Sequence, residues 1–206
     1  MNEKINILAI HPKTIAACGL FQAKNNVRYY LNGIYFEPGK NGGVVAVATD
    51  GHSMLAVYDE HATIEAPIIV EFQPYTITQC RGKNPGALLA VNRVADTECL
   101  VSLQLPGHTM NCRLIEGKYP DWRSVMPDSL PESVSPVHHL NSAYLEKMSK
   151  AAQILSTKKT YTSTYMVSRD RNNSVLFVFN APMDGLIARG CIMPMSLDSA
   201  PVWGEF

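Results

Sequence analysis

Three stretches of the chain repeat one order of elements, a helix-like segment followed by several strand-like runs, and this repetition restricts the fold more than any other feature. The first unit covers about residues 1–62, the second 63–127 and the third 137–197. Gly, Pro and Asn separate the short apolar runs, as between antiparallel strands. Residues 128–136 are rich in Pro, Ser and Glu, so we place the main boundary at this linker. The pattern predicts an α+β fold with helices packed on antiparallel sheets.

Helix signals occur once in each unit. We expect helices at 12–24, 74–80 and 142–155, the first opening on Pro12. The third is the clearest, because Leu145, Met148, Ala152 and Leu155 form one apolar stripe. Strands are expected at 28–31, 34–36, 44–48, 53–58, 68–70, 87–91, 99–105, 110–115, 164–167, 175–179 and 186–192.

Composition excludes several classes of protein. The chain has 18 Lys and Arg against 18 Asp and Glu, so a DNA contact would need basic residues gathered on one surface. Its 5 cysteines contain no CxxC pair, which argues against a zinc site or a disulfide framework and fits a reducing cytoplasm. The sequence shows no apolar signal segment or membrane span. We therefore expect a cytoplasmic protein with no membrane contact, no cofactor and no metal; the adjacent His138 and His139 do not change this.

Residues 49–52 read Thr-Asp-Gly-His and place an acid two positions from an imidazole. General acid–base catalysis would also need a nucleophile or a metal, and the chain has no GxSxG, HExxH or Walker-type loop. We therefore do not expect an enzyme. The alternatives are a structural turn around Gly51 with a hydrogen-bonded histidine, or a binding role.

Three segments in order carry a resemblance to a known family: Arg28 to Ala56, Glu116 to Pro127 (Glu-Gly-Lys-Tyr-Pro-Asp-Trp-Arg-Ser-Val-Met-Pro), and Cys191 to Leu197 (Cys-Ile-Met-Pro-Met-Ser-Leu). Together they resemble the bacterial sliding clamp, the beta subunit of DNA polymerase III. The resemblance covers about residues 6–197 and implies the DNA-clamp fold. It matches residues 1–127 to the whole middle domain of a clamp and residues 137–197 to the second half of its last domain. No counterpart of the first domain is recognised.

The resemblance also implies a pocket that binds short linear peptides from polymerases and the clamp loader. We call it the peptide slot and expect it between the second and third units. Its deformable apolar surface would come from Met193, Met195, Leu31 and Val125. Where clamps usually carry arginine, this chain has Ser53, Ser124 and Ser196, so its peptide preference should differ. Matching positions are Leu31, Thr49, Gly51, His52, Met54, Pro120, Ser124, Val125, Asn141, Tyr144, Ser174, Met193, Pro194, Met195 and Leu197.

In clamps, helices that present Lys and Arg line the ring around double-stranded DNA. The candidates for such phosphate contacts are Lys13, Lys24, Arg81, Lys83, Lys147 and Lys150. The alternative for each is an ordinary solvated helix face.

The resemblance implies a non-enzymatic processivity factor that holds DNA non-specifically and tethers polymerase or clamp-loader peptides. Clamp rings contain twelve such units, so three per chain predict a homo-oligomer of four chains. The alternative is an interaction or decoy module that binds a host clamp or its partners without encircling DNA. Residues 198–206 form a tail with two aromatic side chains, which is either irregular or a ligand for the protein's own pocket.

Overall fold

The computed structural model describes residues 6–82, 86–95, 98–126, 140–156, 164–167, 174–179 and 183–195. Its helices are α1 (Pro12–Cys18), α2 (Pro74–Gln79) and α3 (Ser142–Leu155), with short 3-10 helices η1 (Tyr29–Asn32) and η2 (Trp122–Ser124). Its strands are β1 (Asn6–Ile10), β2 (Ile34–Pro38), β3 (Val44–Thr49), β4 (Ser53–Asp59), β5 (Ile68–Glu71), β6 (Ala87–Ala95), β7 (Glu98–Leu105), β8 (His108–Leu114), β9 (Thr164–Val167), β10 (Val175–Phe179) and β11 (Leu186–Ile192).

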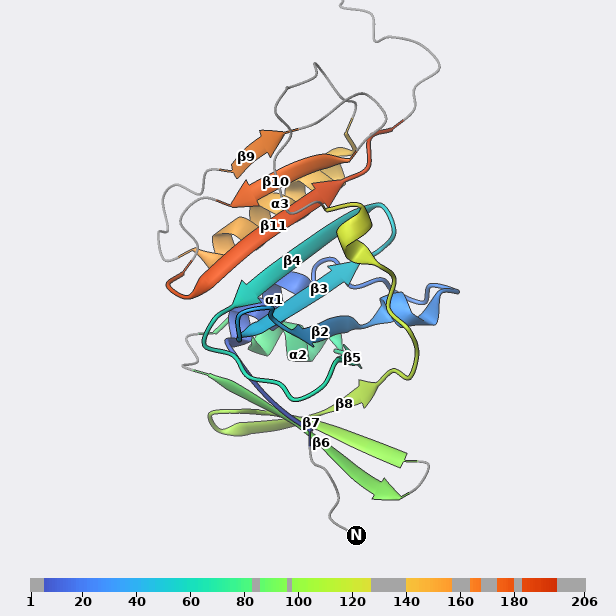
Figure 1. Cartoon of the computed structure of the whole chain (residues 1–206), viewed down its shortest axis with the longest axis vertical. Helices are drawn as coiled ribbons and strands as arrows, with labels where there is room; N and C mark the ends of the chain where they lie inside the picture. The colour runs from blue at the N-terminus through green and yellow to red at the C-terminus, as the bar shows by residue number, and fades with distance from the viewer. Residues whose placement is uncertain are drawn as a thin grey trace, which may run out of the picture.

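All the strands belong to one antiparallel sheet in the order β1-β6-β7-β8-β5-β2-β3-β4-β11-β10-β9 (Figure 1). The first two units exchange their first strands, because β1 pairs with β6 of the second unit and β5 pairs with β2 of the first. An antiparallel sheet together with helices confirms the predicted α+β class. This exchange makes the first two units one body.

The third unit extends the sheet from the first unit. β11 pairs with β4 along its whole length, from Leu186 opposite Asp59 to Ile192 opposite Ser53. The third unit therefore lies beside the first in the sheet, and the Ser174 hydroxyl also bonds Val125 O of the second unit, so the expected slot between the second and third units stays a prediction. The second unit contributes only the segment after β8, which returns across the sheet to η2 (Figure 1).

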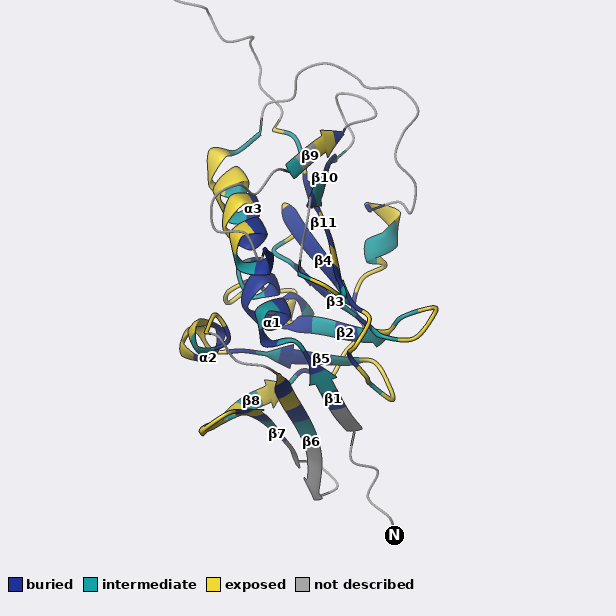
Figure 2. Ribbon diagram, turned by 90° about the vertical axis from the view of Figure 1, so that its left-hand side faces the viewer, coloured by how far each residue is buried: buried dark blue, intermediate teal, exposed yellow. Residues whose placement is uncertain are grey.

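The three helices cover one face of the sheet, and the segment leading to η2 lies over the opposite face, here called the outer face (Figure 2). Strand alternation explains the two layers. On β3, Val44, Ala46 and Ala48 belong to the core under the helices, whereas Val47 belongs to a second core on the outer face. That second core also contains Leu31, Met54, Tyr119 and Met126.

Three local predictions were wrong. The first helix ends at Cys18 rather than Lys24, where the backbone N–H of Gly19 bonds to Ile15 O, and Gly19 lies close against Ile77 of α2. The expected strand at 28–31 is part of a loop and η1, because the Asn32 side chain bonds both backbone groups of Asn26. Strand β1 was not predicted.

Candidate functional site

The turn at residues 49–53 is held by its own side chains. Thr49 Oγ1 donates to Ser53 O at 2.9 Å and accepts from Gly51 N at 3.0 Å. Asp50 Oδ1 accepts from the backbone N–H groups of His52 and Ser53 at 3.0 and 2.8 Å. Gly51 has φ of +93°, a conformation that glycine adopts without steric cost. The turn is thus rigid, and His52 projects from it as an exposed side chain.

One hydrogen bond joins the first and last motifs at this turn, and the second core contains residues of all three motifs, Met54, Met126 and Cys191. Met193 N donates to His52 O at 2.9 Å, which carries the β4–β11 pairing one step beyond the strands. Ser174 Oγ donates to Val125 O at 3.0 Å and joins the third unit to the segment after η2. Residues far apart in the sequence therefore form one surface.

Helix α3 lies against the turn at residues 49–53. Its N-cap is Asn141, whose side chain accepts from Ala143 N, so this residue has a structural role. The Tyr144 ring stacks on His52 with centroids 6.2 Å apart. Lys147 Nζ lies 2.5 Å from Asp50 Oδ2 and also over the rings of Tyr144 and Phe21.

The Asp50 carboxylate stays ionised in this setting. Burial by itself would raise its pKa, but the hydrogen bonds from Lys147, Ser53 and His52 outweigh burial, and the pKa lies below its ordinary value. A carboxylate held in this way joins the turn to α3 and is a poor general base. The geometry favours the structural interpretation of the Asp50–His52 pair over the catalytic one.

Exposure divides the predicted slot residues into two layers. Val125, Met193 and Met195 are 42%, 40% and 48% exposed, whereas Leu31 and Met54 are only 1% and 3% exposed. The first three can contact a ligand, and the other two support the surface from below. Pro120 is exposed beside the buried Tyr119, and Pro194 is half-buried. Leu197 and Ser196 lie outside the described residues.

Two of the serines that replace the arginines expected from the resemblance make internal hydrogen bonds. Ser53 is 2% exposed, and its hydroxyl donates to Asp50. Ser124 Oγ donates to Asp121 O at 2.7 Å at the start of η2. Neither hydroxyl replaces the long cationic arm of an arginine.

The candidate DNA-binding cations are distributed unevenly. Lys13 lies on α1, but Lys24 lies beyond the end of that helix, so the two do not share a helical face. Arg81 is exposed after α2, and Lys83 lies outside the described residues. Lys150 pairs with Glu146 on the solvent side of α3, and Lys147 is occupied by Asp50. Sequence spacing could not reveal the Lys147 contact, which spans 97 positions.

Thiol reactivity and metal binding have little support in the part of the chain that the structure describes. Cys18, Cys80, Cys112 and Cys191 are free thiols. Burial raises the pKa of Cys80 and of Cys191 to about 12, which disfavours the reactive thiolate. Within the described ranges, no cluster of His, Cys, Asp and Glu could hold a metal ion. No described helix is long and apolar enough to cross a membrane.

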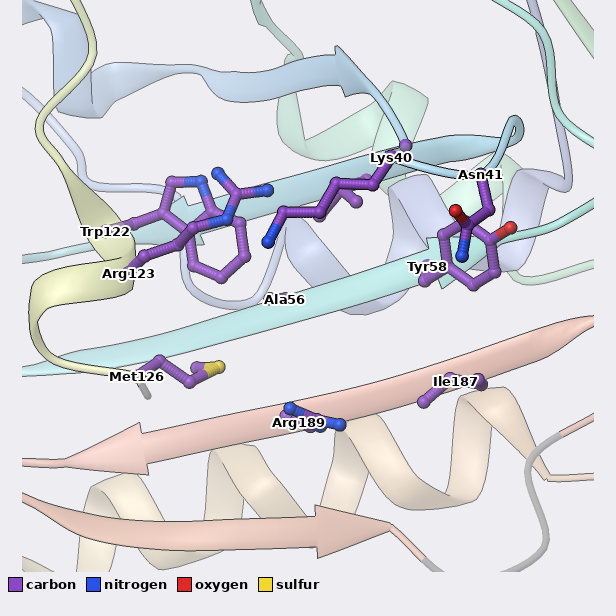
Figure 3. Close-up of a pocket in the computed structure, with 11 residues that line it drawn as sticks. Lys40, Asn41, Ala56, Tyr58, Trp122, Arg123, Met126, Ile187 and Arg189 are labelled. Atoms are coloured by element: carbon purple, nitrogen blue, oxygen red, sulfur yellow. The ribbon is translucent and has the colours of Figure 1, made fainter. Parts of the chain in front are cut away.

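Sequence reasoning missed a pocket of about 350 Å³ on the outer face (Figure 3). Its floor contains Ala56 of β4 with Ile187 and Arg189 of β11. Its walls are the β2–β3 hairpin with Lys40 and the segment from Trp122 to Met126. We call it the outer pocket. Trp122 and Arg123 lie inside a recognised motif, yet nothing in the motif signalled this role.

Solved structures of sliding clamps share this fold. A clamp from Bartonella birtlesii bound to griselimycin matches with a TM-score of 0.67 and 15% identity over 96% of this chain and 67% of that one. A Pseudomonas aeruginosa clamp with a ligand matches with a TM-score of 0.65 and 16% identity, again over 96% and 67%. The architecture is therefore that of a DNA clamp.

Sequence comparison gives the family. Residues 10–121 match the model of the DNA polymerase III beta subunit, central domain. The beta sliding clamp of Pseudomonas putida is 32% identical over 114 residues, 51% of this chain and 28% of its own length. That of Vibrio cholerae is 32% identical over 148 residues, 66% of this chain and 36% of its own length. The chain belongs to the DNA polymerase III beta subunit family and spans about a third of the length of these relatives.

Proposed function

We propose that this protein is a shortened sliding clamp that holds double-stranded DNA without sequence preference and tethers polymerase or clamp-loader peptides in the peptide slot. It performs no catalytic step. The observation that carries the proposal is the hydrogen bond from Met193 N to His52 O, because it joins the last motif to the turn of the first. This contact favours a slot between the first and third units.

The exposed part of the slot suits a short apolar anchor. Met193, Met195 and Val125 offer flexible or small apolar side chains above the fully buried Leu31 and Met54. Methionine adapts its shape to a leucine or phenylalanine side chain at small cost. Ser53, Ser124 and Ser196 cannot make the charge-assisted contacts that arginines would make with a peptide. Each such contact is worth about 1 kcal/mol at an exposed site, so we expect peptide binding of micromolar or weaker affinity.

We assign the DNA contact to the face that carries the helices. All three helices lie on that side of the sheet, away from the outer pocket (Figure 2). Lys13, Arg81 and Lys150 belong to these helices or their ends and would contact phosphates as mobile charges. The net charge of zero means that this contact is weak per chain and sensitive to salt.

Titration of a labelled peptide with a Gln, Leu and Phe clamp-binding pattern tests the slot. We expect saturable binding to the native protein and at least tenfold weaker binding to Met193→Asp, because a charge in the slot must be desolvated. Leu88→Asp is the matched control, since Leu88 on β6 is 37% exposed, close to the 40% of Met193, and lies in the second unit. Equal binding by native protein and Met193→Asp would refute the slot.

A second function is favoured by one observation, the pairing of candidate DNA-binding cations in a chain of zero net charge: Lys147 pairs with Asp50 and Lys150 pairs with Glu146. A chain with this surface but without ring closure would compete for clamp-binding peptides as a decoy. Both functions require the slot. The mass of the assembly in solution separates them.

A further inference from the structure

The peptide slot and the outer pocket lie on one face of the sheet. Ile187 and Arg189 of β11 line the pocket, and Met193 of the slot follows them in the same alternation, which backbone pairing continues past the strand. On β4, Met54 beneath the slot and Ala56 in the pocket are two positions apart and belong to the same apolar core. The two sites are therefore neighbours along the strands.

The two sites also share a wall, the segment from Trp122 to Met126. Val125 belongs to the slot and is 42% exposed, whereas its neighbour Met126 is 3% exposed and lines the pocket. A peptide that lies in the slot can therefore continue over Val125 into the pocket. None of the slot residues named from the resemblance lines the pocket, so the pocket is an additional site.

The pocket suits an uncharged side chain, because the cations at its rim already have partners. Arg123 pairs with Glu37 at 2.6 Å, and Lys40 and Arg189 each interact with another group of the chain. An acidic ligand would have to displace these partners, and a basic ligand would be repelled by the cations. The floor instead offers Ile187, which is 55% exposed on a strand with neighbours on both sides. Covering this aliphatic surface would supply the affinity.

The size and the walls of the pocket favour one aromatic ring. Its volume of about 350 Å³ is at the lower end of the roughly 300–1,000 Å³ of small-ligand sites, so it admits one large side chain rather than a folded element. The rings of Trp122 and Tyr58 line the pocket from opposite ends, with the apolar floor between them (Figure 3). A third ring can make offset or edge contacts with both.

Strand geometry sets the spacing between the two sites. Met193 and Ile187 are six positions apart in the sequence, a distance of ~20 Å at ~3.3 Å per residue. An extended peptide on this face needs about six residues between the side chain in the slot and the one in the pocket. A linker of one residue spans only ~7 Å and falls short.

We propose that the outer pocket binds one uncharged aromatic side chain of the same partner peptide whose apolar anchor fills the slot, about six residues away along that peptide. The inference rests on the proposed function, because the slot holds the first anchor. The second side chain is tethered by the first, so a contact too weak to bind alone still adds to the affinity. The pocket would distinguish partners that carry this second side chain from partners with the slot pattern alone.

Fluorescence anisotropy with labelled peptides and the full chain tests the proposal. The first peptide carries only the Gln, Leu and Phe slot pattern. Two longer peptides add a tryptophan through a six-residue Gly and Ser linker, one on the amino side and one on the carboxyl side. We expect about tenfold tighter binding for one of the two. A one-residue linker, or Asp in place of the added tryptophan, should return the affinity to within about twofold of the first peptide.

Protein variants locate the second contact. Ile187→Asp should remove most of the gain, because the ring would then desolvate a charge, and Ile187→Ala should reduce the gain without adding a charge. Both variants should bind the slot-only peptide as the native protein does, which also verifies that they are folded. Tyr75→Asp is the control, since Tyr75 on α2 is 64% exposed and lies on the helix side of the sheet, and it should keep the full gain.

The possible failures are distinguishable. If the slot-only peptide binds and neither longer peptide binds more tightly, the inference is wrong and the proposed function stands. A gain that persists in both Ile187→Asp and Ile187→Ala would place the tryptophan elsewhere and would also overturn the inference. If the slot-only peptide does not bind the native protein, the proposed function fails and the inference fails with it.

Discussion

The Asp50 side chain bonds the turn at residues 49–53, the first residue of β4 and helix α3. Its two carboxylate oxygens accept from the backbone of His52 and Ser53, from the Ser53 hydroxyl and from Lys147. A partly buried acceptor with this many donors is costly to leave unpaired. The third unit is therefore attached to the first by a charge pair as well as by strand pairing.

Lys147→Met should lower the free energy of unfolding by about 1–2 kcal/mol at pH 7, because Asp50 loses a charged donor while its backbone donors remain. Urea unfolding measures the change. Lys150→Met is the control, since Lys150 pairs with Glu146 on the exposed side of the same helix. We expect a change within about 0.5 kcal/mol for the control. Equal losses in the two variants would contradict the structural role of Lys147.

The same pair gives a pH dependence of defined sign. The pKa of Asp50 is lowered in the folded chain. Its contribution is thus fully present above the unfolded pKa of about 3.9 and is lost as the pH falls through the folded pKa. The stability difference between native protein and Lys147→Met should persist from pH 7 to 5 and vanish in stronger acid.

At the scale of elements, α3 attaches the third unit to the body of the protein. Met148, Ala151, Ala152 and Leu155 are its buried residues, and α3 lies against α1 and β11. Met148 is 2% exposed and packs so closely on Gly190 of β11 that a side chain there would collide with its sulfur. Helix α3 and strand β11 are therefore closely packed at this point, with no room for a side chain at Gly190.

Met148→Ala should destabilise the protein by about 2–4 kcal/mol, because it leaves a cavity between α3, α1 and β11. Chemical unfolding measures the loss. Ser149→Ala, at an exposed position of the same helix, should change stability by less than about 0.5 kcal/mol. A small effect of Met148→Ala would show that α3 is not packed as described.

For the whole molecule, β9 is the edge strand that we propose a second chain covers. The strand after the helix in each of the first two units, β2 and β6, pairs with the first strand of its sister unit. The equivalent strand of the third unit is β9, and within the described part of the chain it pairs with β10 alone. A twin unit from a second copy would cover this edge by an isologous contact.

An isologous β9 contact joins two chains, or six units, and a ring of twelve units needs two such pairs joined by a further contact. Under the clamp function, light scattering at tens of micromolar should therefore show four chains. Met166→Lys should lower the mass, because Met166 on β9 is 57% exposed and a charge on an edge strand opposes pairing. Val27→Lys, at a 97% exposed loop position, should leave the mass unchanged. Monomer alone in the native protein would favour the decoy function over the ring.

Local periodicity by itself determined most elements of this protein. The predicted bounds are those of β9, β10, β11 and α3. Strand alternation and an apolar helical stripe depend on residues close together in the sequence, so the sequence pattern is enough to predict them. The three motifs also indicated the family. Their order in the sequence was enough, since the resemblance depends on residue identity.

Contacts between distant residues were decided only by the tertiary structure. These contacts placed the third unit beside β4, shortened α1 at Gly19 and engaged Lys147 with Asp50. They also assembled the outer pocket from Lys40, Trp122 and Arg189, which no spacing connects. The physical reason is the same in each case: hydrophobic burial and charge pairing depend on which surfaces meet, and local residue patterns do not specify this.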